Sequence, residues 1–249
     1  MNKKVKGIVL IILNIIFLTY LSILSLFYEI FSIFHLAVFL LFRIGKLDDF
    51  YRVHNWLYGR FLIFISWPYI RTSVRGKKHI PPDGPYVIVL NHRSFADIFF
   101  SSLVPIPNQL VIVRGWVFKI FIFSWAMKLA GYINIDRTST EELLAAGKAL
   151  KDRNVSFQFY PEAHRSGDGK LNRFRKGAFL FSVKNNIPVI PVCLAGVERF
   201  AFKTFPFMHP AQIRVDILPP VFPSDFTSED PAKEMRKHVV RLYREYFEE

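Results

Sequence analysis

The chain has 249 residues, a net charge of +13 and an aromatic content of 16%. Disordered tails that bind nucleic acid are poor in aromatic and apolar residues, so this composition excludes that class and no nucleic-acid partner is expected. A basic, apolar chain is typical of a protein held against an anionic membrane surface; a basic soluble protein with a large core is the alternative. The single cysteine, Cys193, lies in an apolar run, which favours a buried structural thiol and suits the cytoplasmic side.

Residues 7–42 form a long apolar region whose only formal charge is Glu29. Residues 7–27 are long enough to cross a hydrocarbon core of about 30 Å, whereas residues 30–42 are too short to do so comfortably. Three lysines precede the region, and Arg43 and Lys46 follow it, so the positive-inside rule places both ends on the cytoplasmic side. We therefore predict a membrane-associated helical hairpin over residues 1–47, on the cytoplasmic face of the inner membrane, with a single span as the alternative.

Residues 48–70 are rich in Trp, Tyr and Phe, which favours an interfacial helix; a plain core helix is the alternative. From residue 71 to residue 249, strand and helix signals alternate, which predicts an α/β domain with a mostly parallel sheet flanked by helices. The expected strands are 72–74, 86–90, 109–113, 132–135, 155–160, 188–194 and 212–218. The expected helices are 97–103, 116–130, 139–153, 177–185 and 231–247.

The stretch from Asn91 to Asp97 follows the apolar run 86–90, so His92 is expected at the carboxyl end of a buried strand, where open α/β sheets place their chemistry. Five residues of helix turn by about 500°, which would put His92 and Asp97 on different faces. The two side chains meet only if a loop between them leads into a helix. Ser94 and Asp97 have the spacing of a capping box that starts such a helix.

Two interpretations of this stretch remain open. In the first, Asp97 accepts a hydrogen bond from one ring nitrogen of His92, which fixes the tautomer and leaves the other nitrogen free to take a proton. In the second, Asp97 caps a helix beside an ordinary loop histidine.

Three further stretches end an apolar strand in polar residues: Gly131 to Arg137, Phe159 to Ser166, and Ile187 to Val192. Together with Asn91 to Asp97 and in this order, they resemble the glycerolipid acyltransferase family. That family has Asn-His followed four residues later by Asp, then Gly-x-Ile-x-Ile-Asp-Arg, then Phe-Pro-Glu-Gly-Thr-Arg-Ser, then Pro-Val-Ile-Pro-Val. The resemblance covers roughly residues 70–220 and is strongest to bacterial members that acylate lysophosphatidic acid.

The resemblance implies transfer of an acyl chain from acyl carrier protein or coenzyme A to the sn-2 hydroxyl of lysophosphatidic acid. His92 would be the general base, and Asp97 would orient it. Arg165 and Arg137 are candidates to bind the acceptor's phosphate, and Glu162 to position Arg165 or an acceptor hydroxyl. Arg114 follows a predicted strand and is a further candidate. Arg137 paired with Asp136 at the surface is the alternative for that residue.

The third motif departs from the family. Tyr160 replaces Phe, and Ala163 and His164 stand where the family usually has Gly-Thr, in the loop that contacts the acceptor's phosphate. A different lysolipid acceptor therefore remains an alternative. A basic run, Lys170 to Lys176, faces either anionic lipid or an acidic carrier, or is simply solvated. The apolar segment 110–131 either encloses an acyl chain or is ordinary core.

Two other classes of function fit the sequence less well. A membrane-bound lipid hydrolase would usually carry a nucleophile elbow or a metal cluster, and the sequence has neither Gly-x-Ser-x-Gly nor His, Asp and Glu at metal-ligand spacing. A non-catalytic lipid-binding protein would not need His92 and Asp97 together. No nucleotide fingerprint or phosphate loop is found. No metal or other cofactor is therefore expected.

Overall fold

The computed structural model describes residues 3–42, 45–162, 164, 171–200 and 208–248, with the backbone alone at 3–6 and 121–123. Its centre is a seven-stranded sheet with the order β1-β7-β6-β2-β5-β3-β4. The strands are β1 (Ile70–Arg75), β2 (Val87–Leu90), β3 (Gln109–Val113), β4 (Ile133–Asn134), β5 (Ser156–Phe159), β6 (Val189–Ala195) and β7 (Ala211–Ile217).

All neighbouring strands are parallel except β6 and β7, so β1 and β7 run against the other five. The predicted fold class, a mostly parallel sheet flanked by helices, is confirmed. The central strand β2 pairs with β5 on one side and β6 on the other. The chain that leaves β2 at Leu90 therefore enters a loop beside the ends of two other parallel strands, where side chains from separate motifs meet.

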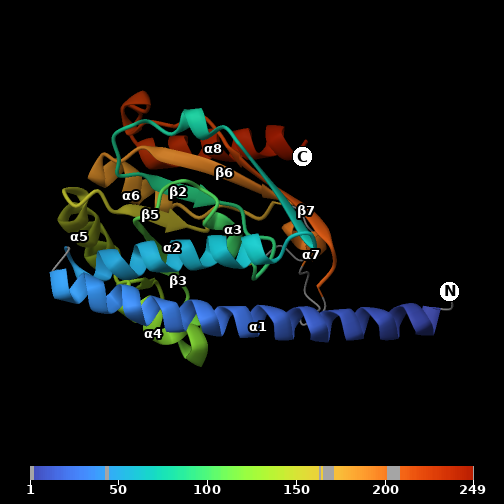
Figure 1. Cartoon of the computed structure of the whole chain (residues 1–249). Coiled ribbons are helices and arrows are strands. Elements are labelled where there is room, and N and C mark those ends of the chain that lie inside the picture. Colours follow the sequence, from blue (N-terminus) through green and yellow to red (C-terminus); the bar gives the residue numbers. More distant parts are fainter. Residues whose placement is uncertain (1–2, 43–44, 163, 165–170, 201–207, 249) are drawn as a thin grey trace.

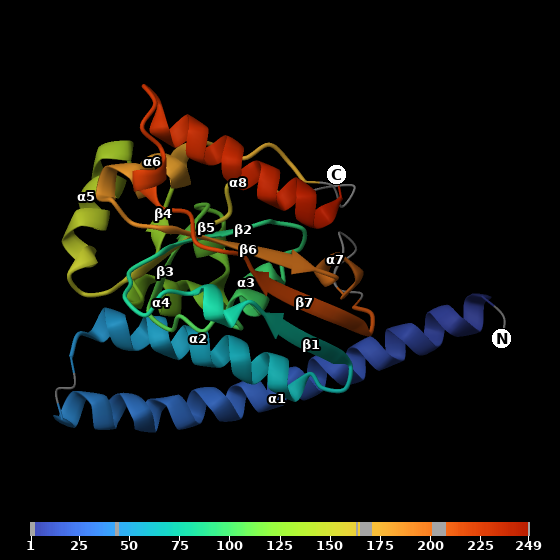
Figure 2. The same ribbon diagram turned by 90° about the horizontal axis from the view of Figure 1, so that it is seen from above.

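Helices cover both faces of this sheet (Figures 1 and 2). They are α1 (Lys3–Phe42), α2 (Leu47–Ile65), α3 (Asp97–Ser101), α4 (Phe121–Leu129), α5 (Thr140–Lys151), α6 (Gly177–Asn185), α7 (Val197–Phe200) and α8 (Pro231–Phe247), with 3-10 turns η1 (Lys77–His79), η2 (Val117–Lys119) and η3 (Pro223–Asp225). Helices α6 and α8 have the predicted bounds. Helix α5 begins with the predicted capping box, in which Ser139 and Glu142 satisfy each other's backbone N–H groups.

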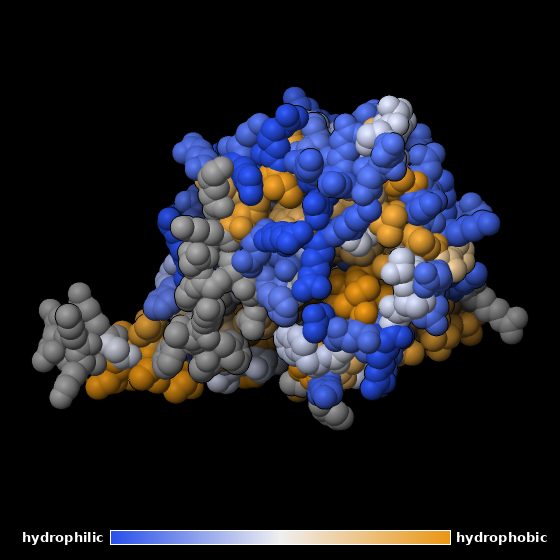
Figure 3. All heavy atoms as spheres, turned by 180° about the vertical axis from the view of Figure 1, so that it is seen from behind, coloured by the Kyte–Doolittle hydropathy of each residue, from blue (hydrophilic) through white to orange (hydrophobic). Residues whose placement is uncertain are grey.

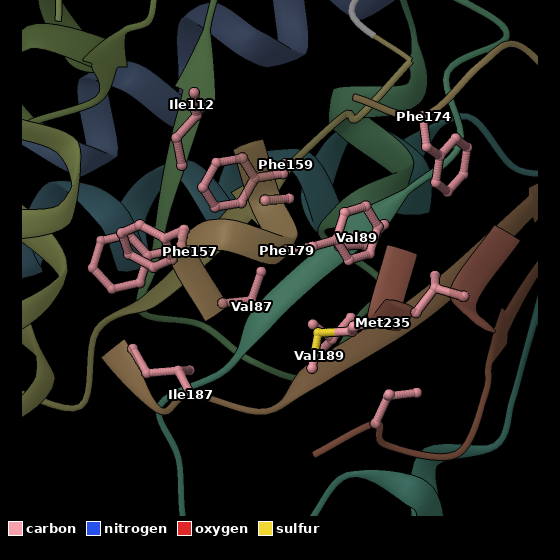
Figure 4. Close-up of a cluster of buried hydrophobic side chains, with 14 of the residues drawn as sticks. Val87, Val89, Ile112, Phe157, Phe159, Phe174, Phe179, Ile187, Val189 and Met235 are labelled. Atoms are coloured by element: carbon pink, nitrogen blue, oxygen red, sulfur yellow. The ribbon is translucent and has the colours of Figure 1, made fainter. Parts of the chain in front are cut away.

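Two hydrophobic cores lie on opposite faces of the sheet. Because side chains alternate along a strand, Ile88 and Leu90 of β2 enter one core, and Val87 and Val89 enter the other. Figure 4 shows the second core, in which β2, β3, β5 and β6 pack against α6 and α8. All four of these β2 side chains are fully buried, so the strand that carries the Asn91 to Asp97 stretch is firmly held.

The predicted hairpin within residues 1–47 is wrong in its internal structure. Residues 3–42 form one continuous helix, α1, and the chain reverses only after it, so that α1 and α2 lie side by side (Figure 1). The apolar pattern runs unbroken through Glu29, whose carboxylate accepts a hydrogen bond from Ser32 and lies 3.7 Å from His54. A charged residue with partners does not end a helix, and the charge balance at the two ends of the region places those ends without fixing a turn between them.

The predicted helix over residues 116–130 is also wrong in part. The structure divides it into η2 and α4, with an extended residue, Ile120, between them. The apolar character of the sequence continues across this break, and no Pro or Gly marks it. Gly131 ends α4 with a positive φ of 69°, as predicted.

Helix α1 is the most exposed apolar element among the described residues. By length and composition, Gly7–Phe42 could cross a membrane, and only 6% of its most apolar 18-residue stretch is buried inside the protein. Asn14 nevertheless exchanges hydrogen bonds with the backbone of Met208, and Phe17 stacks on Tyr69 at 4.4 Å. In Figure 3 the apolar surface follows the edge that α1 occupies, whereas the rest of that face is mainly hydrophilic around an apolar hollow.

Candidate active site

The end of β2 is fastened to β6 by Asn91. Its side-chain amide donates to the carbonyl of Leu194 at 2.9 Å, and its side-chain oxygen accepts from the N–H of Leu194 at 2.7 Å. Asn91 is fully buried. This pair of hydrogen bonds satisfies backbone groups at the point where the ladder ends, and it fixes the direction in which the following residue, His92, leaves the sheet.

His92 and Asp97 are in contact, as the loop-and-helix interpretation predicts. The Nδ1 atom of His92 lies 2.8 Å from Oδ2 of Asp97, which also accepts hydrogen bonds from the N–H groups of Arg93 and Ser94. Asp97 is fully buried, and burial raises the pKa of its carboxyl group, while the hydrogen bonds from His92, Ser94 and Arg93 oppose that rise. The bond from Ser94 N–H is one half of the predicted capping box, but the Ser94 hydroxyl accepts from the N–H of Ala96, and α3 begins at Asp97 with no side-chain hydrogen bond at its N-cap, Ala96. Asp97 therefore holds the imidazole and the loop before α3.

The His92 side chain remains 24% exposed and lines a cavity. Asp97 occupies Nδ1, and Nε2 has no partner among the described residues. A histidine held at Nδ1 by a carboxylate presents its other nitrogen as a proton acceptor. The geometry thus allows His92 to act as a base toward a group in the cavity.

Glu162 bridges two loops. One carboxylate oxygen accepts from the N–H of His92 at 2.7 Å, and the other accepts from the N–H of Asn172 at 2.8 Å. Burial raises the pKa of Glu162 to about 7, although these two hydrogen bonds and the nearby His92 and Arg93 counteract part of the effect. The structure therefore gives Glu162 backbone partners. Its predicted partner Arg165 lies outside the described residues, as does Ala163.

Arg114 and Arg137 lie in different surroundings. The Nε atom of Arg114 is 2.8 Å from Oδ1 of Asp136, and the other oxygen of Asp136 accepts from the N–H of Gly115. Arg114 and Asp136 line the same cavity as His92. Arg137 is exposed and is not among the lining residues, and the carboxylate that the alternative interpretation assigned to it is held by Arg114.

The cavity has a volume of about 670 Å³ and lies between the sheet and helices α2, α3 and α4. Apolar side chains from η2, α4 and neighbouring elements make up much of its wall, among them Trp116, Val117, Ile120, Met127, Phe99 and Val111. The segment 110–131 contributes both to the core and to the cavity wall, because Met127 is buried and also lines the cavity; enclosure of an acyl chain stays a prediction. A large apolar cavity with a few polar groups at its wall is the usual form of a small-molecule site.

Sequence reasoning missed several lining residues as members of a site. Arg175 was noted only as part of a basic run, and His164 only as a departure from a pattern; both line the cavity. Gln158 was passed over within a predicted strand, and Tyr160 was noted only as a replacement of Phe. Their signal was available: they are polar residues at alternate positions of an apolar strand and therefore share one face.

Comparison with known proteins agrees with this geometry. The sequence profile of the Acyltransferase family matches residues 71–195. The 1-acyl-sn-glycerol-3-phosphate acyltransferase alpha of Mus musculus is 30% identical over 71% of this chain, and that of Homo sapiens is 30% identical over 74%. These alignments span 65% and 68% of the two relatives, about two thirds of their length.

A solved structure is also similar. The crystal structure of the 1-acyl-sn-glycerophosphate (LPA) acyltransferase PlsC from Thermotoga maritima superposes with a TM-score of 0.73 and 26% identity, covering 95% of this chain and 97% of that one. The chain therefore belongs to the acyltransferase family.

Proposed function

We propose that this protein transfers an acyl chain from an acyl thioester to the sn-2 hydroxyl of lysophosphatidic acid and so forms phosphatidic acid. The observation that carries the proposal is the buried Asp97 holding His92 by Nδ1 at the wall of a large, mostly apolar cavity. The names of the similar proteins support the same acceptor and product.

In the proposed mechanism, Nε2 of His92 takes the proton of the acceptor hydroxyl as its oxygen attacks the thioester carbonyl. Asp97 stabilises the imidazolium that forms. The tetrahedral intermediate then collapses, the carbon–sulfur bond breaks, and the departing thiolate takes the proton from His92. Attack is direct and involves no acyl-enzyme, so the chain needs only a base, its orienting carboxylate and groups that hold the two substrates.

The acceptor's phosphate is the expected partner of the arginines. Two of the three predicted arginines lie within the described residues. Arg114 lines the cavity and is oriented by Asp136, whereas Arg137 is exposed outside the cavity, so Arg114 is the better placed of these two. Arg165 follows Glu162 in the sequence, within the same motif, and remains a candidate.

The donor is proposed to place its acyl chain in the cavity and its carrier outside. An apolar wall suits a hydrocarbon chain. Arg173, Arg175 and Lys176 are exposed just before α6, and Arg175 reaches the cavity wall. This positive charge suits either an acidic acyl carrier protein or the phosphates of coenzyme A.

Another lysolipid acceptor is the second candidate function. His164 lines the cavity where the family pattern has Thr, so an unusual side chain faces the expected acceptor. A panel of lysolipids that differ only in the headgroup separates the two. Higher kcat/KM with a headgroup other than the phosphate monoester would favour the second candidate.

The protein is proposed to lie on an anionic membrane surface, at the cytoplasmic face of the inner membrane. A helix of 40 residues is about 60 Å long, twice the hydrocarbon thickness. Contacts from Asn14 to Phe39 hold α1 along α2 and the domain, so a perpendicular crossing would carry charged domain surface into the lipid. These contacts favour a monotopic arrangement in which the exposed face of α1 rests in the interface.

The test is acyl transfer in membranes that contain the protein, with labelled acyl thioester and lysophosphatidic acid. His92→Ala should lower kcat by about 10²–10⁴-fold, the usual contribution of a general base. His238→Ala, on α8 across the sheet from α1 and α2, is the matched control and should keep wild-type activity (Figure 1). A wild-type protein without activity on any lysolipid would refute the function, and an active His92→Ala would refute the mechanism alone.

A further inference from the structure

Strand β5 carries two polar side chains on the face that forms the cavity. Phe157 and Phe159 belong to the core on the α6 and α8 side, although Phe159 also borders the cavity, and Gln158 and the following Tyr160 line the cavity. The register of β5 places Gln158 beside Val111 of β3, which also lines the cavity. An apolar residue at either position would complete the wall for an unsubstituted hydrocarbon chain, so the two polar groups call for a separate explanation.

The two side chains are linked to each other. Nε2 of Gln158 donates to the hydroxyl of Tyr160 at 3.0 Å. Gln158 is only 1% exposed, and its amide oxygen has no hydrogen-bond partner among the described residues although the side chain borders the cavity. A ligand hydroxyl that donates to this oxygen would make a hydrogen bond that no protein group among the described residues supplies.

Tyr160 brings this pair close to the reacting groups. Its ring lies 4.7 Å from the ring of His92, centroid to centroid. Burial raises the pKa of Tyr160 well above its usual range, so the phenol keeps its proton. Gln158 lies two residues earlier on β5, about 7 Å further from the end of the strand. A polar group on the donor's acyl chain that reaches Gln158 and Tyr160 therefore lies a short way along that acyl chain from the thioester.

The hydroxyl of Tyr160 is not needed for the reaction that the family shares. The family pattern has Phe at this position, so acyl transfer proceeds there without a phenol. The hydroxyl and its partner Gln158 are then available for a property of this chain, and the nearest property is the choice of acyl group.

We propose that Gln158 and Tyr160 form a polar subsite in the wall of the acyl cavity that binds a hydroxyl group carried near the thioester end of the donor's acyl chain. The amide oxygen of Gln158 accepts a hydrogen bond from the ligand hydroxyl, and the Tyr160 hydroxyl, which also bonds with Ser101, holds the amide group of Gln158 in place. The substrate class is therefore hydroxyacyl thioesters. This inference rests on the proposed acyl-transfer function and adds the donor class to it.

The test compares three coenzyme A thioesters of equal chain length: unsubstituted, 3-hydroxylated, and hydroxylated at the far end of the chain. The full-length protein in phospholipid vesicles is assayed with lysophosphatidic acid, and kcat/KM is measured for each donor. We expect the 3-hydroxy donor to be preferred over both others by about tenfold, the worth of one recovered hydrogen bond. Equal use of the three donors would overturn the subsite while leaving acyl transfer established, and failure with every donor would overturn the proposed function itself.

Variants then locate the preference. Tyr160→Phe, which restores the family residue, and Gln158→Leu should each reduce the ratio of kcat/KM for the 3-hydroxy and unsubstituted donors by about tenfold. Tyr132→Phe removes another hydroxyl from the wall of the same cavity and should leave the ratio unchanged. If Tyr132→Phe lowers the ratio as much, or if the first two variants leave it unchanged, the proposal is wrong. Even if a variant fails to fold, the preference of the wild type between the two hydroxylated donors still tests whether a hydroxyl-binding subsite lies near the thioester.

Discussion

The end of β2 and the outer face of α1 differ in where their partners lie. Around His92, the side chains of Asn91 and Glu162 and one carboxylate oxygen of Asp97, Oδ2, find their hydrogen-bond partners within the same chain. Along α1, side chains such as Leu26, Phe34 and Leu41 are 63%, 63% and 76% exposed. The first region is explained by contacts within the protein, whereas the second requires apolar surroundings that the protein itself does not supply.

The energetic scale of this difference is large. Burying one large apolar side chain is worth about 1.5–3 kcal/mol, and α1 leaves more than a dozen such side chains exposed. Exposed patches of this kind mark protein or membrane interfaces. The region at the end of β2 should therefore respond to changes that break internal hydrogen bonds. Helix α1 should respond to changes that alter its affinity for lipid.

The largest effect is expected on the outer face of α1. Replacing Leu26, Ile30 and Phe34 with Glu puts three charges where lipid contact is proposed. The partition coefficient onto anionic vesicles should fall by at least about a thousandfold, because each charge costs a few kcal/mol in hydrocarbon. Vesicle co-sedimentation measures the partition coefficient.

The matched control replaces Ser224, Thr227 and Ser228, all exposed on the domain, with Glu. It changes the net charge by the same amount and should lower binding only modestly, by weakening attraction to anionic lipid. Equal losses in the two triple variants would mean that charge alone holds the protein to the membrane.

The second effect concerns α2, the helix that packs against both α1 and the elements around the site. Arg52 of α2 is 1% exposed and contacts Asp48, Asn108 and the carbonyl of Ala130. Arg52→Met leaves these acceptors without their buried donor, so the free energy of unfolding should fall by about 3 kcal/mol. Because Arg153 also pairs with Asp48, that carboxylate keeps a partner, and the loss of stability should lie near the lower end of the range for a broken buried ion pair. Urea unfolding measures it.

Arg60→Met makes the same change on the same helix. Arg60 is exposed and lies over the ring of Trp56 at 4.7 Å, so the cost should stay below about 1 kcal/mol. A comparable loss in both variants would show that α2 is sensitive to any lost charge and that the buried network has no special weight.

The third effect is a pH dependence at the site. Burial holds the pKa of Glu162 at about 7 in the folded protein, above its value of 4.5 in the unfolded chain. Between these values the folded state keeps a proton that the unfolded state has lost, so the contribution of Glu162 to stability falls as pH rises. The wild type should lose on the order of 2 kcal/mol relative to Glu162→Gln between about pH 4.5 and pH 7.

Chemical unfolding of both proteins across this range gives the difference. Glu229→Gln, an exposed carboxylate before α8, should run parallel to the wild type. A Glu162→Gln curve that also runs parallel would place the pKa of Glu162 near its ordinary value.

The smallest effect is expected at the start of α5. Ser139 accepts a hydrogen bond from the N–H of Glu142 at 3.1 Å, at an exposed helix end, and does not itself line the cavity. Ser139→Ala should lower the free energy of unfolding by about 1 kcal/mol and leave activity and membrane binding unchanged. Thermal unfolding against the control Thr227→Ala measures it, and a larger effect on activity would tie α5 to the site.

The sequence by itself determined the features that depend on neighbouring residues. The alternation of Val87 to Leu90 between two cores follows from strand periodicity, and the bounds of α6 and α8 follow from their flanking residues. The contact between His92 and Asp97 was predictable because only a loop of that length brings the two side chains together. The capping box of Ser139 is equally local.

Only the tertiary structure decided the rest, because it depends on residues distant in sequence. The Asp136 carboxylate pairs with Arg114, 22 positions earlier, rather than with the adjacent Arg137. Glu162 joins His92 to Asn172, and the cavity exists because α2, α3 and α4 stop short of filling one sheet face. A local pattern states which face a side chain takes, whereas its partner is set by packing of whole elements, where burial and hydrogen bonding across the fold outweigh proximity in the chain.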